Sequence, residues 1–314
     1  MRQDLVDKSI IALRRCETSL NHAKNQPVFV FLCGGDAKEP RYICRNETEQ
    51  YLRKNQNLST IVCVRPEILL KQYGSLLEEL DLLELEAFIA EVSDAVLLYD
   101  ESPGTVCELG AFAMSDPIWK IMTAAIPEKH KNDDSFIING PVRHMEKGAT
   151  SYPLSSVIYL DINCPFSSID LAKYFHHLRE NVAKQSNRRI NKNAGSVNLN
   201  SLCREYLDLI SVFAPLSDDE LIDIYKRYKD FDSFVLQSNT FSPIPKGVNV
   251  KTVIAFLSAT GLVEYKDSLI TMTGRVPSYF MFNASKSRQI AEIRAQVLAA
   301  KRRHYDRCDS VYFE

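Results

Sequence analysis

The segment AVLLYDESPGTVCELGAFA (residues 95–113) contains the transition on which the predicted fold depends. It begins with a short apolar run, which is typical of a buried strand in a parallel sheet. Ser102 followed by Pro103 is typical of a helix start, with serine as the N-cap and proline at the first helical position. Glu108 is the only charged residue of this predicted helix. A buried ionised carboxylate costs free energy unless it is compensated, so the sequence poses the question of what Glu108 does.

The alternation of strand and helix continues on both sides of this segment. Apolar runs predict further strands at 28–33, 59–64, 119–126 and 156–161. Helical spacing predicts helices at 45–55, 76–92 and 167–184. This order predicts an α/β fold with a doubly wound, mostly parallel five-stranded sheet of the flavodoxin or Rossmann type. Trp119 is expected to begin the fourth strand and to lie in the core.

A smaller, mostly helical domain is predicted after a polar, basic linker at 186–198, SNRRINKNAGSVN. Helices are expected at 199–213, 217–230 and 248–260, a β-hairpin around Lys266 and Asp267, and a basic amphipathic helix at 285–307. Helices followed by a hairpin is the order of a winged-helix module. The expected division is an N-terminal helix at 1–25, a catalytic domain at 26–185, the linker, and a winged-helix-like domain at 199–314.

Charge and cysteine content restrict the class of protein. Residues 1–161 contain 17 Lys and Arg against 24 Asp and Glu, a charge of −7, whereas residues 162–314 contain 21 against 16, a charge of +5. The basic part is therefore a candidate for binding a polyanion. No signal-peptide core or membrane span is found, so we expect a cytoplasmic protein. The eight cysteines lack metal-site spacing, and we expect them to be reduced and structural, with Cys33, Cys63 and Cys107 buried.

The predicted position of Glu108 suggests chemistry. Ligands of doubly wound sheets bind beyond the carboxyl ends of the strands, where the loops at 34–36, 100–104 and 139–145 are expected to meet. A carboxylate at the mouth of that cleft can attack an anomeric carbon, or stabilise it as it becomes an oxocarbenium ion. The helix N-terminus would keep it ionised. The alternative is an ordinary early-helix glutamate that faces water.

Three motifs together resemble a known family. FLCGGD (31–36), ESPGTVCELGAF (101–112) and GPVR (140–143) resemble the nucleoside 2-deoxyribosyltransferase superfamily. Their order is more closely similar to that of deoxyribosyltransferase-like effector (toxin) proteins encoded beside reverse transcriptases in type II bacterial retrons. In those proteins a winged-helix-like DNA-binding domain follows. The resemblance covers most of the chain and is strongest over 28–145.

The resemblance implies roles for individual residues. Glu108 matches the nucleophilic glutamate, and Glu86 matches an acidic position that faces the substrate. Substrate-binding residues are implied at Cys33, Gly34, Gly35, Asp36, Arg45, Asp100, Ser102, Pro103, Gly104, Asn139 and Arg143. The loop at 100–102 is shorter than in the transferases. The glycines also fit a plain tight turn, Glu86 a solvated acidic helix, and Arg143 an ion pair within its own loop.

The resemblance further implies a function. It predicts a toxin that cleaves the N-glycosidic bond of a nucleotide, NAD or a deoxynucleotide, with no cofactor or metal. Its predicted partners are the retron reverse transcriptase and its multicopy branched RNA–DNA, which would hold it inactive in a higher-order complex. One alternative is a metabolic deoxyribosyltransferase or a nucleotide phosphoribohydrolase, whose PGGxGTxxE motif PGTVCE nearly matches. Another is a DNA-binding regulator that only senses a nucleotide.

The basic C-terminal part predicts contacts to a nucleic-acid backbone. The helix at 248–260 has Lys251 as its one charge, which is unsuited to reading base edges. Phosphate contacts are therefore expected from Lys246, Lys251, Lys266, Arg275, Lys301, Arg302 and Arg303. The alternatives are a solvated charged helix and a protein interface.

Overall fold

The computed structural model describes residues 3–17, 26–35, 39, 43–149, 151–152, 154–161, 171–185, 195–274 and 279–309. The chain divides into two compact units. We call residues 27–186 with 238–248 the sheet unit, and residues 1–26, 187–237 and 249–314 the helical unit. Within the described part of the chain, no helix is both long and apolar enough to cross a membrane.

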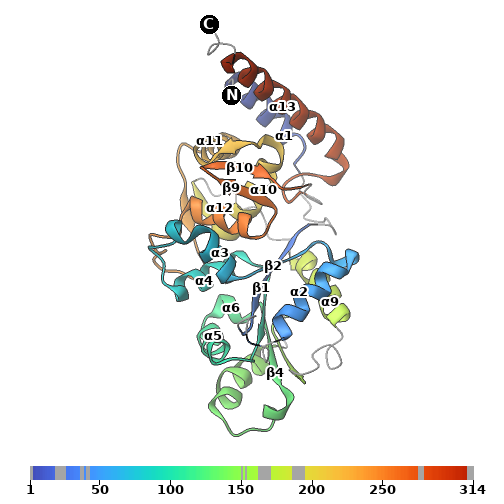
Figure 1. The fold of residues 1–314 in the computed structure, drawn as a ribbon, viewed down its shortest axis with the longest axis vertical. Coiled ribbons are helices and arrows are strands. Elements are labelled where there is room, and N and C mark those ends of the chain that lie inside the picture. The colour runs from blue at the N-terminus through green and yellow to red at the C-terminus, as the bar shows by residue number, and fades with distance from the viewer. Residues whose placement is uncertain are drawn as a thin grey trace. The chain divides into compact units, whose positions relative to one another are not determined.

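The sheet unit is built on five parallel strands in the order β2-β1-β3-β4-β5 (Figure 1). The strands are β1 (Val28–Cys33), β2 (Ile61–Val64), β3 (Ala95–Tyr99), β4 (Met122–Pro127) and β5 (Ser156–Leu160). Every residue of β1 and β3 is buried, as their continuous apolar sequences predict. The predicted α/β fold with a parallel five-stranded sheet is confirmed.

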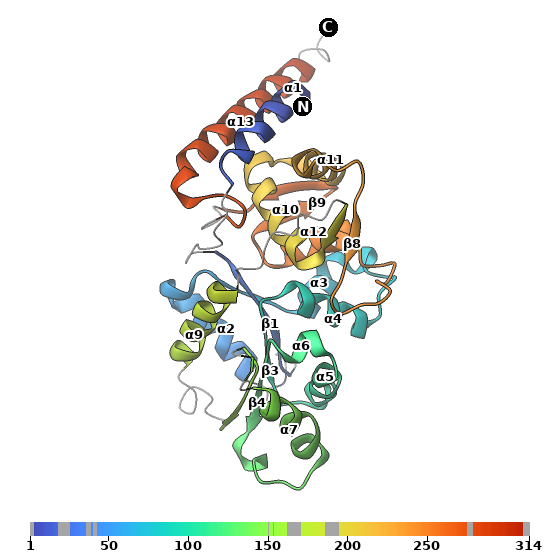
Figure 2. The same cartoon turned by 180° about the vertical axis from the view of Figure 1, so that it is seen from behind.

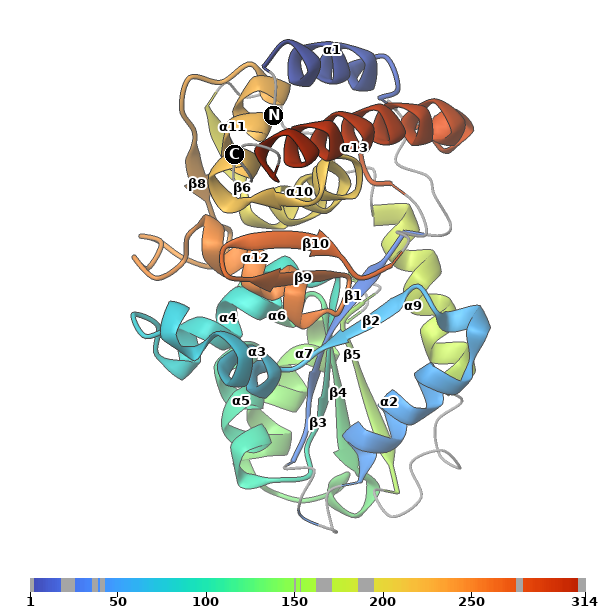
Figure 3. The same cartoon turned by 45° about the horizontal axis from the view of Figure 1, so that its top comes forward.

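Helices cover both faces of this sheet (Figure 3). One face carries α2 (Cys44–Lys54) and α9 (Leu171–Gln185). The other carries α4 (Leu82–Val92), α5 (Pro103–Ala113) and α6 (Asp116–Trp119), and α3 (Pro66–Tyr73) and α7 (Arg143–Gly148) complete the helices of this unit described here. From β1 the chain moves to β2 on one side, and it then returns to β3 on the other. The crevice between β1 and β3 is therefore the topological switch point of the sheet, where doubly wound folds bind ligands.

Two local expectations are wrong in this unit. Trp119 does not begin β4 but ends the short helix α6, where it is buried and donates from its indole N–H to Asp116 (3.1 Å). Its aromatic, strand-forming character reflects a core position and not the strand itself. Cys107 is exposed on α5, whereas Cys33 is buried. Small apolar neighbours do not reveal which face of a short helix meets solvent.

Residues 238–248, which we call the strap, pack along α4 within the sheet unit. At the end of α4, the buried Glu91 carboxylate accepts hydrogen bonds from the Asn239 backbone N–H (2.7 Å) and the Ser238 hydroxyl. Just before α4, Gly247 lies so close to Leu80 that an added Cβ would come within 2.7 Å of Leu80 Cγ. The strap is thus fixed near both ends of α4.

The helical unit contains α10 (Leu199–Phe213), α11 (Asp218–Lys229) and α12 (Val250–Ala259), with β7 (Leu216–Ser217), β9 (Val263–Lys266) and β10 (Leu269–Met272). These strands form an antiparallel sheet in the order β7-β10-β9. Asp267 and Ser268 join β9 to β10 with positive φ angles of 52° and 60°, which suits a two-residue hairpin turn. The predicted hairpin is therefore confirmed.

Two terminal helices and a small second sheet complete the helical unit. Figure 2 shows α1 (Gln3–Arg14) beside α13 (Ser287–Asp309). Arg14 at the end of α1 donates to the backbone oxygens of Arg227 (2.7 Å) and Tyr228 (3.1 Å) in α11. The short strands β6 (Ser196–Asn198) and β8 (Val235–Gln237) pair in parallel. Distant parts of the sequence thus fold together in this unit.

Buried ionisable groups of the helical unit have hydrogen-bond partners. Asp208 is fully buried, and its carboxylate accepts from the backbone N–H groups of Phe280 (2.8 and 3.0 Å) and Met281 (2.6 Å). Lys301 continues the buried face of α13, and its ammonium donates to the backbone oxygens of Phe213 (2.8 Å) and Pro215. It caps the carboxyl end of α10, a favourable place for a cation.

Candidate functional site

The helix that carries Glu108 begins as the sequence predicts. Ser102 is its N-cap, and its hydroxyl accepts from the Thr105 backbone N–H (3.2 Å) while the Thr105 hydroxyl accepts from the Ser102 N–H (2.9 Å). Pro103 occupies the first helical position, and Gly104 is exposed beside it. This reciprocal cap fixes the start of α5 at the carboxyl edge of the sheet.

Glu108 faces the switch point. The thiol of Cys33, the last residue of β1, donates a hydrogen bond to the Glu108 carboxylate. Burial raises the pKa of Glu108, while this thiol and the positive charge of Arg45 oppose the rise. The Oε2 atom of Glu108 is buried without a hydrogen-bond partner among the described residues. Glu108 therefore presents a partly compensated carboxylate with one free oxygen, unlike a solvated early-helix glutamate.

Glu86 lies in the same electrostatic cluster. It belongs to α4, is buried, and has its pKa raised to about 8, first by burial and then by the negative charges of Glu108 and Glu67. The sequence also allowed a solvated Glu86, and burial rules that out. Two neighbouring carboxyl groups are thus placed in different environments, which is how proteins separate a protonated carboxyl from an ionised one.

Arg45 supplies positive charge to this cluster. Its side chain is 5% exposed, and its guanidinium pairs with Glu67 (2.8 Å between Nη1 and Oε1). The Arg45 Nε atom is buried and has no partner within the described residues. Two carboxyl groups in α4 and α5, a third in Glu67 and a single guanidinium leave an excess of acidic groups at the switch point.

The loop between β3 and α5 contributes a residue that sequence reasoning missed. Glu101 accepts hydrogen bonds from the backbone N–H groups of Gly35 (3.1 Å) and Cys44 (3.2 Å). An added Cβ on Gly34 would lie 2.7 Å from Arg45 Cβ and 2.9 Å from Glu101 Oε1. Gly34 is therefore required for close approach of these elements, beyond a plain turn. Asp36, from the same predicted motif, is outside the described residues.

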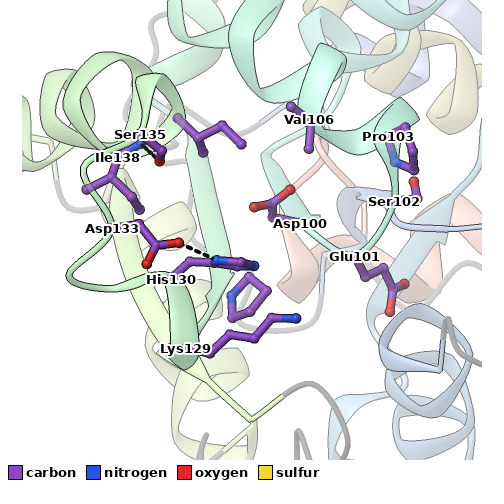
Figure 4. A pocket seen from close by; sticks show the side chains of 12 residues that line it. Asp100, Glu101, Ser102, Pro103, Val106, Lys129, His130, Asp133, Ser135 and Ile138 are labelled. Carbon is purple, nitrogen blue, oxygen red and sulfur yellow. Dashed lines mark hydrogen bonds and ion pairs between the residues drawn. The ribbon is translucent and has the colours of Figure 1, made fainter.

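A cavity of about 340 Å³ lies at the ends of β3 and β4 (Figure 4). Asp100, Ser102 and Pro103 line it, as expected for this loop. Figure 4 shows Asp100 pointing into the cavity, and burial raises its pKa while the charge of His130 opposes the rise. The cavity is the size of a small-ligand pocket.

The opposite wall of this cavity was not predicted. It includes Lys129 and His130, and His130 Nδ1 lies 2.6 Å from Asp133 Oδ2. A cluster KHKNDD gives no periodic signal, so only the fold could place it here. Val106 lines the cavity but Glu108 does not, because residues two positions apart in a helix point in nearly opposite directions. Glu108 therefore lies on the other side of α5 from this cavity, and the expected single cleft mouth is two adjacent places.

The GPVR segment does not join either place. It follows a π-helical turn at Ile138–Val142, and Arg143 is exposed at the start of α7. Asn139 is exposed and donates to Asp134 (2.8 Å). Neither residue lines the cavity. The extra residue per turn in this segment rotates the side chains, which sequence spacing does not reveal.

The expected nucleic-acid residues separate into three groups. Lys246, Lys266 and Arg302 are exposed, and Lys266 lies at the hairpin. Lys251 pairs with Asp218 (3.2 Å), and Lys301 is buried in the interaction described above, so the expectation that Lys301 contacts phosphate is wrong. Arg275 and the side chain of Arg303 lie outside the described residues. Within the described part, no cluster of three His, Cys, Asp or Glu side chains is arranged to hold a metal.

The sheet unit is thus a doubly wound α/β domain with a buried carboxyl cluster at its switch point. Residues 42–265 match the family model described as STM3845 retron effector protein, and the chain belongs to this family. The predicted retron effector is therefore confirmed at the level of the family.

Two Escherichia coli proteins are similar to this chain. It is 31% identical over 178 residues to the "Retron Ec86 putative ribosyltransferase/DNA-binding protein", covering 55% of this chain and 56% of that relative. It is 26% identical over 258 residues to the "Retron Ec73 putative ribosyltransferase/DNA-binding protein", covering 77% and 78%. The first match thus spans little more than half of that relative's length.

Proposed function

We propose that this retron effector is an enzyme that cleaves the N-glycosidic bond of a nucleotide, NAD or a deoxynucleotide. The observation that carries the proposal is Glu108 at the switch point, with Oε2 unpartnered among the described residues and Cys33 donating to the same carboxylate. The names of the two retron relatives, which include ribosyltransferase, support glycosyl transfer.

The proposed mechanism uses Glu108 on the anomeric carbon. The free Oε2 would attack that carbon, or stabilise its positive charge as the base departs. With Glu67 paired to Arg45, the negative charge of Glu108 itself would stabilise a positively charged transition state. Water would then take the place of an acceptor base and release the sugar.

Glu86 is the proposed general acid. With a pKa of about 8 it is protonated at neutral pH and could donate its proton to the base of a deoxynucleotide, which would otherwise leave as an anion and now leaves as a neutral molecule. A nicotinamide group leaves as a neutral molecule from a cation and needs no such proton. Dependence on Glu86 would therefore distinguish the two substrate classes.

The helical unit is the proposed partner-binding part. Its order from α10 onward is α10-β7-α11-β8-α12-β9-β10, and the sheet order β7-β10-β9 supports a winged-helix-like module. The exposed Lys266 and Arg302 are available for phosphates. We infer that the effector acts in cytoplasmic phage defence and is held inactive by the retron reverse transcriptase and its RNA–DNA.

Nucleotide analysis tests this function. Wild type, Glu108→Gln and the exposed-residue control Glu128→Gln would be expressed in bacteria without partner genes. NAD, deoxynucleotides and free bases would be quantified by mass spectrometry. We expect growth arrest, loss of one nucleotide and release of its base with wild type and Glu128→Gln only. Identical pools in all three strains, both alone and with the neighbouring retron genes present and triggered by phage, would overturn the proposal.

A further inference from the structure

Glu101 links two elements of the candidate site without lining its reactive centre. It lies two residues before α5, the helix of Glu108. Its Oε1 accepts from the Gly35 N–H after β1, and its Oε2 accepts from the Cys44 N–H at the start of α2. In Figure 4, Glu101 and the neighbouring Asp100 point in different directions, and only Asp100 turns into the cavity. Glu101 lines the cavity as well, but its carboxylate oxygens accept hydrogen bonds from the backbone of two neighbouring elements.

The helix α2 lacks a cap of its own. Its N-cap residue is Ile43, whose side chain makes no capping hydrogen bond, and Cys44 is the first helical residue. The first N–H groups of a helix need outside acceptors, and a carboxylate there also interacts favourably with the helix dipole. Glu101 supplies both from a loop 57 positions away in the sequence.

Arg45 follows Cys44 directly, so the cap sets the position of its side chain. Gly34 packs between Arg45 and Glu101 with no room for a Cβ. The Arg45 side chain is buried, and its positive charge opposes the rise in the pKa of Glu108. The arrangement connects the start of α5, the end of β1 and the first turn of α2 in one rigid contact.

We propose that Glu101 is a positioning residue of this site, which holds Arg45 within electrostatic reach of Glu108 by bridging the backbone of Gly35 and Cys44. This inference rests on the proposed function for its catalytic meaning. Its geometry does not depend on turnover. Replacing Glu101 would let the first turn of α2 open and the positive charge move away from Glu108. A neutral amide at this position loses the charge and one of two acceptor oxygens.

Titration of Glu108 tests the inference independently of catalysis. The full-length chain would be labelled with carbon-13 at glutamate carboxyls, and the Glu108 signal assigned by its loss in Glu108→Gln. We expect Glu101→Gln to raise the pKa of Glu108 by half a unit or more, because less positive charge would then lie near Glu108 to stabilise its ionised form. Glu128→Gln, a matched change at an exposed glutamate, should leave it unchanged. An unchanged Glu108 titration in folded Glu101→Gln would overturn the inference.

A double-mutant cycle and a second variant sharpen this test. In an Arg45→Lys background, Glu101→Gln should shift the Glu108 titration by less than half as much, because both changes act through one guanidinium. Equal shifts in both backgrounds would contradict positioning through Arg45. Glu101→Asp keeps the charge but shortens the reach, and it serves if the amide variant does not fold. Absence of nucleotide cleavage by wild type would instead remove the proposed function and leave the titration result standing.

Discussion

Glu86 in the sheet unit and Asp208 in the helical unit are both buried carboxyl groups with a pKa raised to about 8. Their hydrogen-bond partners, however, differ. Asp208 accepts three backbone hydrogen bonds and ties α10 to residues 280–281. Glu86 has no hydrogen bond among the described residues, and its neighbours Glu108 and Glu67 are acidic. Burial alone therefore does not mark a functional carboxyl group. The hydrogen-bond partners distinguish the structural carboxyl of Asp208 from the carboxyl of Glu86, which we propose to be reactive.

Among the variants that test this comparison, Asp208→Asn should lower the free energy of unfolding the most. The amide oxygen can replace only one of the two carboxylate oxygens, so the NH₂ group would lie against the Phe280 backbone N–H, which donates to both oxygens in wild type. We expect the free energy of unfolding to fall by about 3 kcal/mol, with nucleotide cleavage by the remaining folded protein unchanged. Denaturant unfolding and activity per folded molecule would check this. A variant with the same free energy of unfolding as wild type would show that the hydrogen bonds of Asp208 do not stabilise the fold.

Glu86→Gln should instead affect catalysis. For wild type, kcat/KM is expected to fall as pH rises through about 8, because Glu86 then loses the proton that it donates. The glutamine variant should lack this limb and be about 10²-fold slower near neutral pH on a deoxynucleotide. On NAD the loss should be below about tenfold. Persistence of the limb near pH 8 in the variant would remove Glu86 from the mechanism.

Lys301→Met extends the comparison to a buried cation. The change keeps the length of the side chain but leaves the Phe213 and Pro215 oxygens without their donor. We expect a loss of about 2 kcal/mol in unfolding free energy and no change in the salt dependence of nucleic-acid binding. Arg302→Ala, an exposed neighbour, should show the reverse, with a smaller salt slope and little loss of stability. Equal salt slopes for Arg302→Ala and wild type would exclude Arg302 from the interface.

Glu108→Gln should change the free energy of unfolding least among these variants. It should raise this free energy, whereas Asp208→Asn and Lys301→Met lower it. Burial raises the pKa of Glu108, so its ionised form carries a free-energy cost in the folded state. A group whose pKa is higher in the folded state than in the unfolded state stabilises the fold at pH values below its unfolded-state pKa. This contribution to the free energy of unfolding is lost as the pH rises through the folded-state pKa. The neutral variant should therefore be more stable by about 1 kcal/mol at pH 7, with the gain shrinking toward pH 5. Thermal unfolding at both pH values would measure this, and a destabilised variant would indicate a structural Glu108.

Much of the sheet unit follows from local sequence. Continuous apolar runs predict the buried parallel strands, and Ser102-Pro103 predicts the start of α5 because capping is a local interaction. The alternation of strands and helices predicts a parallel sheet with Glu108 beyond the carboxyl end of the third strand, but the order of the strands comes only from the structure. These signals depend on neighbours in the sequence, and the sequence displays them directly.

The remaining features depend on tertiary contacts. Glu101 reads as an ordinary loop acid, and its role appears only when α2 approaches from 57 positions away. Lys301 reads as part of a basic tail, yet it continues a buried helix face whose carbonyl partners lie near the end of α10. His130 and Asp133 come from a polar loop without periodicity. The tertiary partners of such long side chains cannot be predicted from the spacing of residues in the sequence.

The strap also limits how this chain can be divided. Any exchange of the C-terminal half that joins at the linker near residue 190 would replace residues 238–248, and with them Ser238 and Asn239, the donors to Glu91. The new half would have to supply a segment that fits Leu80 as closely as Gly247 does. Recombination between retron effectors at this linker should therefore yield working hybrids only when both parents share the strap, so the two halves are expected to be inherited together.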